Sequence, residues 1–140
     1  RDDYTGKIES INTELLSALL DIGLLPVIAP VAVSHEGEAL NVDADRAAAM
    51  VAAALKADTL LLLTAVPGLM EKFPDESTLI PSLSLAQLDR ALEFAEGRMK
   101  KKVLGAQEAL QGGVAHVVIS DGRISAPISA ALNGSGTHIQ

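Results

Sequence analysis

An asparagine and two aspartates stand close together in the run Asn41-Val42-Asp43-Ala44-Asp45, where they alternate with small apolar residues. The run lies directly ahead of a long Ala-rich stretch that is typical of a helix. Side-chain oxygens that converge at the start of a helix can position metals, other cations or lysines around a reacting phosphate. The simpler interpretation is structural, because Asn and Asp cap helices and an acidic first turn complements the helix dipole. A cap explains only one or two of the three residues, so both interpretations stay open.

Basic residues crowd the run Gly97-Arg98-Met99-Lys100-Lys101-Lys102, which opens a second predicted helix. Each cation in a first helical turn opposes the helix dipole, at a cost of about 0.3–1 kcal/mol. Such a run is favourable where an anion or carboxylates come close, and the free N–H groups of a helix start also suit a phosphate. The alternative is that these lysines are solvated and carry no function.

A Pro-Gly turn with apolar flanks occupies Thr64-Ala65-Val66-Pro67-Gly68-Leu69-Met70, after a predicted strand. Its Leu and Met side chains could cover a flat apolar ring such as adenine, although they would equally suit a packed loop without a ligand. Ligands of open parallel sheets bind beyond the carboxyl ends of the strands, and therefore the loops that follow strands are the candidate sites.

Several familiar signatures are absent from the sequence. There is no G-x-x-x-x-G-K-[ST] phosphate loop and no G-x-G-x-x-G after a strand. His35, His116 and His138 lie far apart without the spacing of metal ligands, and Ser34-His35 lies in no nucleophile elbow. The chain has no cysteine, which excludes disulfides and thiolate metal sites and fits a reducing cytoplasm.

Helical and strand-like patterns alternate along the chain. Apolar periodicity and capping signals predict helices at about 12–22, 44–56, 84–95, 99–110 and 127–132. Short apolar runs predict buried strands at 24–29, 59–63 and 114–120, and an edge strand within 134–139. This alternation predicts an α/β fold with a mainly parallel sheet sandwiched by helices, in a single domain that spans residues 1–140.

Composition narrows the classes of function. The chain has 140 residues, 49% of them apolar, which is enough for one domain with an aliphatic core. Its net charge of −7 argues against a general nucleic-acid binder. No apolar stretch is long enough to span a bilayer and no signal-peptide pattern opens the chain, so we expect no membrane partner and a cytoplasmic location.

Four ordered motifs resemble those of the amino acid kinase family. They are N-V-D-A-D-R-A-A at 41–48, L-L-L-T-A-V-P-G-L at 61–69, G-R-M-K-K-K-V at 97–103 and G-S-G-T-H-I at 134–139. The N-x-[DN]-A-D form is similar to the acetylglutamate kinase group and differs from the uridylate, aspartate and glutamate 5-kinases. The resemblance covers essentially the whole chain, but it corresponds only to the C-terminal, nucleotide-binding half of those enzymes.

Within that group, the run D-Y-T-G-K-I-E at 3–9, Pro67 and Arg98 resemble one particular branch. Its members phosphorylate the side-chain carboxylate of aminoadipate or glutamate attached to a small acidic carrier protein of the LysW type, in lysine or arginine biosynthesis. Acetylglutamate kinase, which acts on free N-acetylglutamate, is the near neighbour, and both acceptors stay open. A non-catalytic α/β regulatory or binding module is the alternative from another class, in which the Asn/Asp run is only a cap.

The resemblance implies roles for individual residues. Asn41 would hydrogen-bond the amino-acid substrate, Asp45 would orient the catalytic lysines, and Lys102 would stabilise the transferring phosphoryl group. The residues that would border the nucleotide are Ala65, Val66, Pro67, Gly68, Leu69, Met70, Phe94, Ala95 and Glu96. ATP is the implied cofactor, with Mg²⁺ held mainly through its phosphates rather than by a metal site of the protein. The full-length enzyme is expected to be a homo-oligomer.

The sequence also departs from the family pattern. Ala65 stands where a polar residue is usual, so a contact there would come from the backbone. Asp43 replaces a common Asn, and Arg98 adds charge where glycine is frequent. The family's Lys-x-Gly-Gly segment and a second glycine-rich segment lie upstream of the part that this chain resembles. We therefore expect the chain to be a C-terminal part of a longer kinase and not to catalyse by itself.

Overall fold

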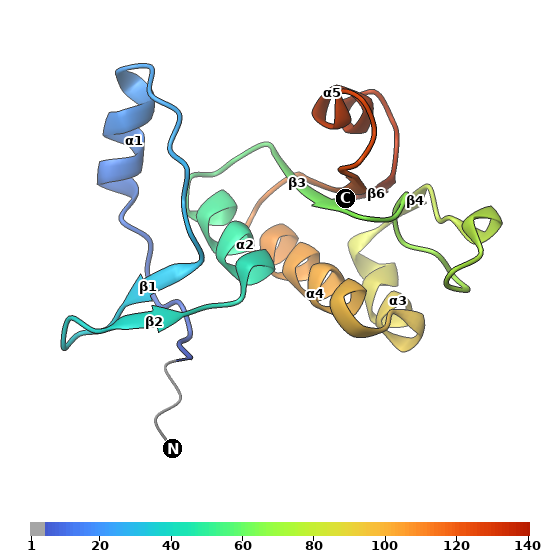
Figure 1. Cartoon of the computed structure of the whole chain (residues 1–140), viewed down its shortest axis with the longest axis horizontal. Helices are drawn as coiled ribbons and strands as arrows, with labels where there is room; N and C mark the ends of the chain where they lie inside the picture. The colour runs from blue at the N-terminus through green and yellow to red at the C-terminus, as the bar shows by residue number, and fades with distance from the viewer. Residues whose placement is uncertain (1–4) are drawn as a thin grey trace.

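A four-stranded sheet with helices on both faces forms the centre of the computed structural model, which describes residues 5–140 (Figure 1). The strands are β3 (Thr59–Thr64), β4 (Ser82–Leu83), β5 (His116–Asp121) and β6 (Thr137–Ile139), and they lie in the order β3-β5-β6-β4. β3 is parallel to β5 and β4 is parallel to β6, whereas β5 and β6 are antiparallel. The predicted α/β class with a mainly parallel sheet is confirmed.

Helices cover the sheet from both sides. α2 (Ala44–Ala54), α3 (Leu88–Phe94) and α4 (Gly97–Gln111) lie on one face, and α5 (Pro127–Leu132) lies on the other (Figure 1). The core between them is made of aliphatic and small side chains, with Leu88, Val103 and Ile119 fully buried. Since alanines supply much of the packed surface of α2 and α4, these two helices can approach closely.

The predicted helix starts rest on identifiable local contacts. The side chain of Asn12 caps α1 (Thr13–Asp21) by accepting a hydrogen bond from the N–H of Leu15 at 3.0 Å. The expected capping signal at Ser84 is present as well, since its N–H donates to Gln87 Oε1 at 2.8 Å. There the chain forms a short 3-10 turn, η2 (Leu85–Gln87), before α3, and a second such turn, η1 (Glu76–Thr78), lies in the long loop after β3.

A small hairpin, β1 (Val31–Val33) and β2 (Ala39–Asn41), lies with α1 on the side of α2 that is away from α4 (Figure 1). Its turn at 34–38 matches the prediction, but its strands were not predicted. Three-residue strands with one partly buried position each are too short to show a period of two.

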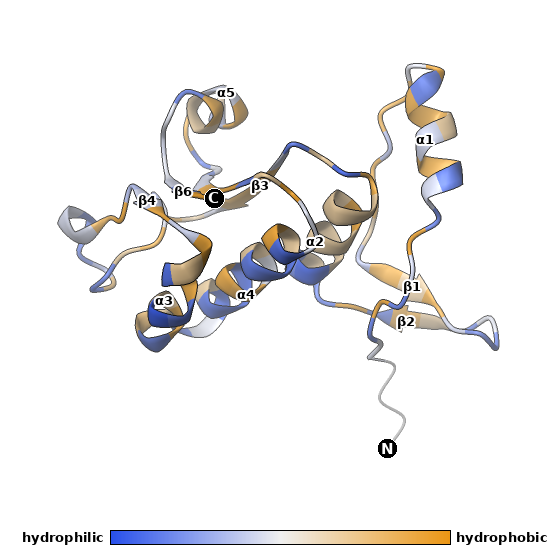
Figure 2. Cartoon of the chain, turned by 180° about the vertical axis from the view of Figure 1, so that it is seen from behind, coloured by the Kyte–Doolittle hydropathy of each residue, from blue (hydrophilic) through white to orange (hydrophobic). Residues whose placement is uncertain are grey.

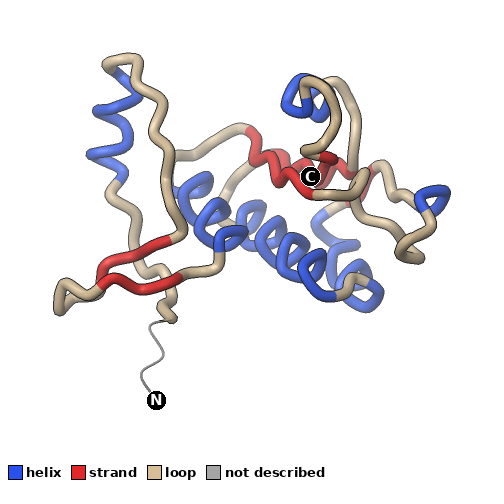
Figure 3. The backbone as a smooth tube through the Cα atoms, viewed as in Figure 1, coloured by secondary structure: helices blue, strands red, loops and turns tan. Residues whose placement is uncertain are grey.

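The prediction of a strand at 24–29 is wrong. This segment is a loop between α1 and β1 (Figure 3), and Leu25 and Val27 are 85% and 94% exposed. In Figure 2 much of this segment is coloured as hydrophobic, and it runs beside α1. A strand needs a neighbour for its backbone hydrogen bonds, and no strand within residues 5–140 pairs with this segment.

The expected edge position of the last strand is also wrong. β6 lies inside the sheet, with β5 on one side and β4 on the other. The outer neighbour β4 has only two residues, which is too short for a sequence pattern to reveal.

None of the helices within residues 5–140 is long and apolar enough to cross a membrane.

Candidate functional site

The Asn/Asp run and the basic run meet where the first turn of α2 packs against the first two turns of α4. Lys102 Nζ donates a hydrogen bond to Asp45 Oδ1 at 2.7 Å, and the two side chains are only 15% and 19% exposed. Lys101 Nζ lies 3.1 Å from Asp43 Oδ2 in a more exposed ion pair. Two basic residues in the second turn of α4 therefore have carboxylates as neighbours, whereas the helix dipole opposes cations mainly in the first turn.

Asp43 is the N-cap of α2, in agreement with the structural interpretation of this residue. Its Oδ1 accepts hydrogen bonds from the N–H groups of Asp45 at 3.1 Å and Arg46 at 3.2 Å. Burial alone would raise the pKa of the Asp43 carboxyl, but hydrogen bonds from Lys101 and from two backbone N–H groups lower it below the ordinary value. Asp43 is therefore held as an anion by the contacts that define the helix start.

The close approach of α2 and α4 depends on a glycine. A Cβ atom on Gly105 would lie 3.1 Å from the carbonyl oxygen of Asp45 and 3.3 Å from its carbonyl carbon. Gly105 follows Lys102 by three residues and therefore lies on the same side of α4. The sequence interpretation missed Gly105, although a glycine one turn after a candidate lysine was a usable signal.

Asn41 ends β2, and its side chain is exposed. Its backbone is held by the N-terminal segment, because Gly6 N–H donates to the Asn41 carbonyl at 2.9 Å and Thr5 forms a parallel bridge with it. Within residues 5–140, no hydrogen bond joins the Asn41 side chain to Asp45 or Lys102. Of the 3–9 run, Asp3 and Tyr4 lie outside the described residues.

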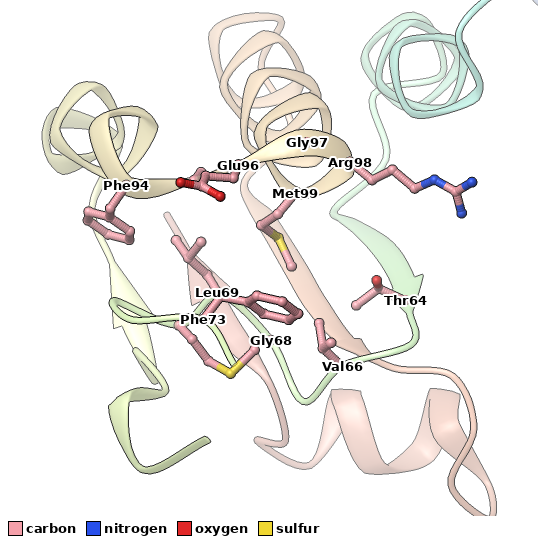
Figure 4. Close-up of a pocket in the computed structure, with 12 residues that line it drawn as sticks. Thr64, Val66, Gly68, Leu69, Phe73, Phe94, Glu96, Gly97, Arg98 and Met99 are labelled. Carbon is pink, nitrogen blue, oxygen red and sulfur yellow. The ribbon is translucent and has the colours of Figure 1, made fainter. Parts of the chain in front are cut away.

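A cavity of about 380 Å³ lies between the loop that follows β3 and the start of α4 (Figure 4). Its lining residues are Thr64, Val66, Gly68, Leu69, Met70, Phe73, Phe94, Ala95, Glu96, Gly97, Arg98 and Met99. This set includes seven of the nine residues expected to border a nucleotide, but it does not include Ala65 or Pro67. The sequence interpretation did not assign Phe73 to the site, because the contact comes from the fold of the long loop rather than from a motif.

The cavity combines apolar walls with a helix start. Met99 points from α4 toward the side of Val66, whereas Arg98 extends away from the cavity centre (Figure 4). No side chain caps α4 at Glu96 within the described part of the chain, and Gly97 and Arg98, its first two residues, both line the cavity. A flat apolar ring and an attached anionic group would both find suitable partners here.

The cavity and the Lys102–Asp45 pair lie at the same end of α4. Residues 98 and 102 are four positions apart in this helix and therefore project from the same side, about one turn apart. Since Arg98 lines the cavity, Lys102 lies about one helical turn beyond its edge.

A further charged pair closes the turn after β5. Arg123 donates to Asp121 through both Nε at 2.9 Å and Nη2 at 2.7 Å, and this hydrogen bonding lowers the pKa of Asp121 to about 2. The N–H of Gly122 donates to the carbonyl of Thr64 at 2.8 Å, which fixes this turn beside the cavity.

Among residues 5–140, no group of three His, Cys, Asp or Glu side chains is arranged to hold a metal ion.

Comparison with known proteins points to one family. A model of the amino acid kinase family matches residues 1–121 of this chain. Among solved structures, N-acetylglutamate synthase from Neisseria gonorrhoeae, complexed with coenzyme A and L-arginine, superposes with a TM-score of 0.87 at 33% identity. That match covers 97% of this chain and 32% of the other.

Two curated relatives are kinases. A LysW-aminoadipate kinase from Deinococcus radiodurans is 56% identical over 137 residues, which cover 98% of this chain and 47% of the relative. An acetylglutamate kinase from Desulforamulus reducens is 39% identical over 123 residues, which cover 86% of this chain and 43% of the relative. The chain thus spans about half the length of the curated relatives that it matches.

Proposed function

Because the chain belongs to the amino acid kinase family, we propose that it is the nucleotide-binding part of a kinase that phosphorylates a side-chain carboxylate. The acceptor is aminoadipate or glutamate linked to a small acidic carrier protein, or free N-acetylglutamate, and the product is an acyl phosphate in lysine or arginine biosynthesis. The observation that carries the proposal is the apolar cavity at the start of α4, beside the Lys102–Asp45 pair.

ATP would bind with its base in the cavity and its phosphates toward the α4 start. The apolar side chains of Val66, Leu69 and Met99 suit the faces of a base, and the uncapped helix start suits an anion. Mg²⁺ would be held mainly through the phosphates of the nucleotide, where it would neutralise part of their charge.

Lys102 is proposed as the catalytic cation. In the reaction, an oxygen of the acceptor carboxylate attacks the γ-phosphorus of ATP while the bond to the ADP oxygen breaks. A carboxylate is already ionised at neutral pH, so the reaction needs alignment and positive charge rather than a strong base. Asp45 holds the Lys102 amino group at 2.7 Å, and a cation whose position is set before the reaction stabilises developing charge at little reorganisation cost.

The carrier-linked acceptor is the preferred one of the two. It is supported by the 56% identity to a LysW-aminoadipate kinase and by the exposed basic residues Arg98, Lys100 and Lys101 beside the site. Asn41 is proposed to contact the amino-acid part of the acceptor. The complete enzyme is proposed to be a cytoplasmic homo-oligomer.

The Lys102→Ala substitution in the intact protein tests this function. Removing the cation that stabilises the transition state should lower kcat about 100-fold or more, with a much smaller change in KM for ATP. Steady-state kinetics with MgATP, together with thermal denaturation, measure both effects. Lys56→Ala, which changes an exposed lysine just after the C-cap of α2, should leave kcat close to that of the wild type.

An unchanged kcat in Lys102→Ala would reject the kinase mechanism at this site. The denaturation curve shows whether a loss of activity in Lys102→Ala comes from the missing cation or from unfolding of the variant. If the variant unfolds, Lys102→Arg, which keeps the charge but alters its geometry, supplies a second measurement of the same role.

A further inference from the structure

The C-terminal run G-S-G-T-H-I has no role in the site described so far, yet it places a polar side chain in the core. Thr137 in β6 is fully buried, and its hydroxyl makes two hydrogen bonds. Oγ1 accepts from the N–H of Leu69 at 2.9 Å and donates to the carbonyl oxygen of Ile80 at 2.7 Å. One hydroxyl therefore joins β6 to two segments that are distant from it in sequence.

These two segments also pair with each other. The N–H of Ile80 donates to the carbonyl of Leu69 at 2.9 Å, and Met70 forms an antiparallel bridge with Leu79. An ordinary antiparallel pair would also join the Leu69 N–H directly to the Ile80 carbonyl. Here the hydroxyl of Thr137 links these two groups, so that it completes the ladder and anchors it to the sheet.

Gly68 permits this anchor through its lack of a side chain. A Cβ atom at position 68 would lie 2.7 Å from Thr137 Oγ1 and 3.0 Å from the Thr137 backbone nitrogen. Distances this short would force the loop away from β6. The Pro-Gly turn thus uses its glycine to bring the loop backbone against Thr137.

The anchored residues form one wall of the cavity. Gly68, Leu69 and Met70 line it on the side that faces the start of α4 (Figure 4). We propose that Thr137 is a positioning residue for the nucleotide, which acts by holding this wall in its binding conformation. This inference rests on the proposed function, since it takes ATP as the ligand of the cavity. Thr137 itself does not line the cavity.

Loss of the hydroxyl would remove the partner of the buried Leu69 N–H and of the partly buried Ile80 carbonyl. Their desolvation disfavours the native path of the loop, which would shift to let water or other groups reach them. Because the other wall belongs to α4, the shift would change the width of the cavity. We therefore expect an effect on nucleotide affinity rather than on the chemistry at Lys102.

The experiment compares Thr137→Val with Thr137→Ser in the intact protein. For Thr137→Val, the Kd for MgATP measured by calorimetry should rise about tenfold, which corresponds to ~1.4 kcal/mol, while kcat at saturating ATP stays nearly unchanged. Thr137→Ser keeps the hydroxyl, so its Kd for MgATP should be close to that of the wild type. Thr59→Val is the matched control in the same sheet, since the Thr59 hydroxyl makes no hydrogen bond within residues 5–140.

Two results would overturn the inference: an unchanged Kd in Thr137→Val, or an equal rise in Thr137→Ser, which would assign the effect to packing. If Thr137→Val does not fold, amide hydrogen exchange of the wild type tests the anchor instead. The Leu69 amide should exchange slowly without nucleotide. If it exchanges as fast as the amides of the exposed loop at 72–77, the anchor is rejected. A wild type that binds no ATP would instead reject the proposed function, while the exchange of Leu69 still tests the anchor.

Discussion

The Lys102–Asp45 contact differs in its burial from the other ion pair at the start of α4, Lys101–Asp43. Exposed pairs, such as that of Lys101 with Asp43, contribute little to stability because water screens them and both side chains lose freedom. Lys102 and Asp45 are each less than one fifth exposed, and the bond between them is shorter. This pair therefore has a defined geometry, which a catalytic cation needs and a solvated lysine lacks.

Asp43 offers a test in which the cap and the charge can be separated. Asp43→Ala should lower the free energy of unfolding by about 1 kcal/mol, because the N–H groups at the start of α2 lose their acceptor. Asp43→Asn keeps an acceptor and should retain most of that stability. Urea denaturation at neutral pH distinguishes the two variants, and equal stability losses would show that the charge and not the cap is the main contribution.

The contribution of Asp43 to the free energy of unfolding should depend on pH in a defined direction. The folded state holds the pKa of Asp43 below its ordinary value of 3.8, so the unfolded state binds a proton first as the pH falls. The advantage of the wild type over Asp43→Asn should be complete well above pH 3.8 and should disappear as the pH falls through the lower folded pKa. A difference that grew on acidification would contradict the ion pair with Lys101.

At the scale of elements, the crossing of α2 over α4 decides where the charged residues meet. The N-cap and first turn of α2 and the first two turns of α4 hold all four members of the Lys101–Asp43 and Lys102–Asp45 pairs. Gly105 permits the close approach of these helices at Asp45, since its Cα faces the Asp45 backbone without a side chain between them. A glycine inside a helix costs about 1 kcal/mol relative to alanine, and the close approach offsets that cost.

We predict that Gly105→Ala lowers kcat about tenfold with little change in KM for ATP, because small displacements of catalytic groups are costly. The added methyl group must push the first turn of α2 away from α4, and Asp45 would move relative to Lys102. Steady-state kinetics test this prediction, and Leu104→Ala on the exposed side of α4 is the control. Wild-type kcat in a more stable Gly105→Ala variant would show that helix propensity dominates at this position.

For the whole molecule, the charge distribution bears on the acceptor. The net charge of −7 on this chain would repel an acidic carrier at long range, whereas the basic residues around the α4 start would attract it locally. Within a Debye length of about 8 Å at physiological salt, the local charges dominate the encounter.

The double substitution Lys100→Gln with Lys101→Gln separates the two acceptors. With the carrier-linked acceptor, kcat/KM should fall about tenfold at low salt, and the loss should shrink as salt is added. With free N-acetylglutamate, kcat/KM should change little. Assays of the intact enzyme measure kcat/KM with each acceptor, and Arg90→Gln on α3 is the surface-charge control. Equal losses on both acceptors would rule out carrier docking at this surface.

Much of the fold could be predicted because its signals are local. α1, α2, α4, α5, β3 and β5 each carry an apolar period or run, and caps such as Asn12 and Asp43 mark where helices begin. The same local motifs selected most of the cavity-lining residues, since the loop after β3 and the segment before α4 are each continuous in sequence.

The tertiary structure decided which of these local elements meet. The sequence alone placed a strand at 24–29 and β6 at an edge, because an apolar run does not specify its neighbours. Likewise, Gly105 and Thr137 show no role in their own segments: one matters through Asp45 and the other through Leu69 and Ile80. Periodicity reports burial along one element, whereas contacts between distant residues come from the packing of layers, which no local pattern encodes.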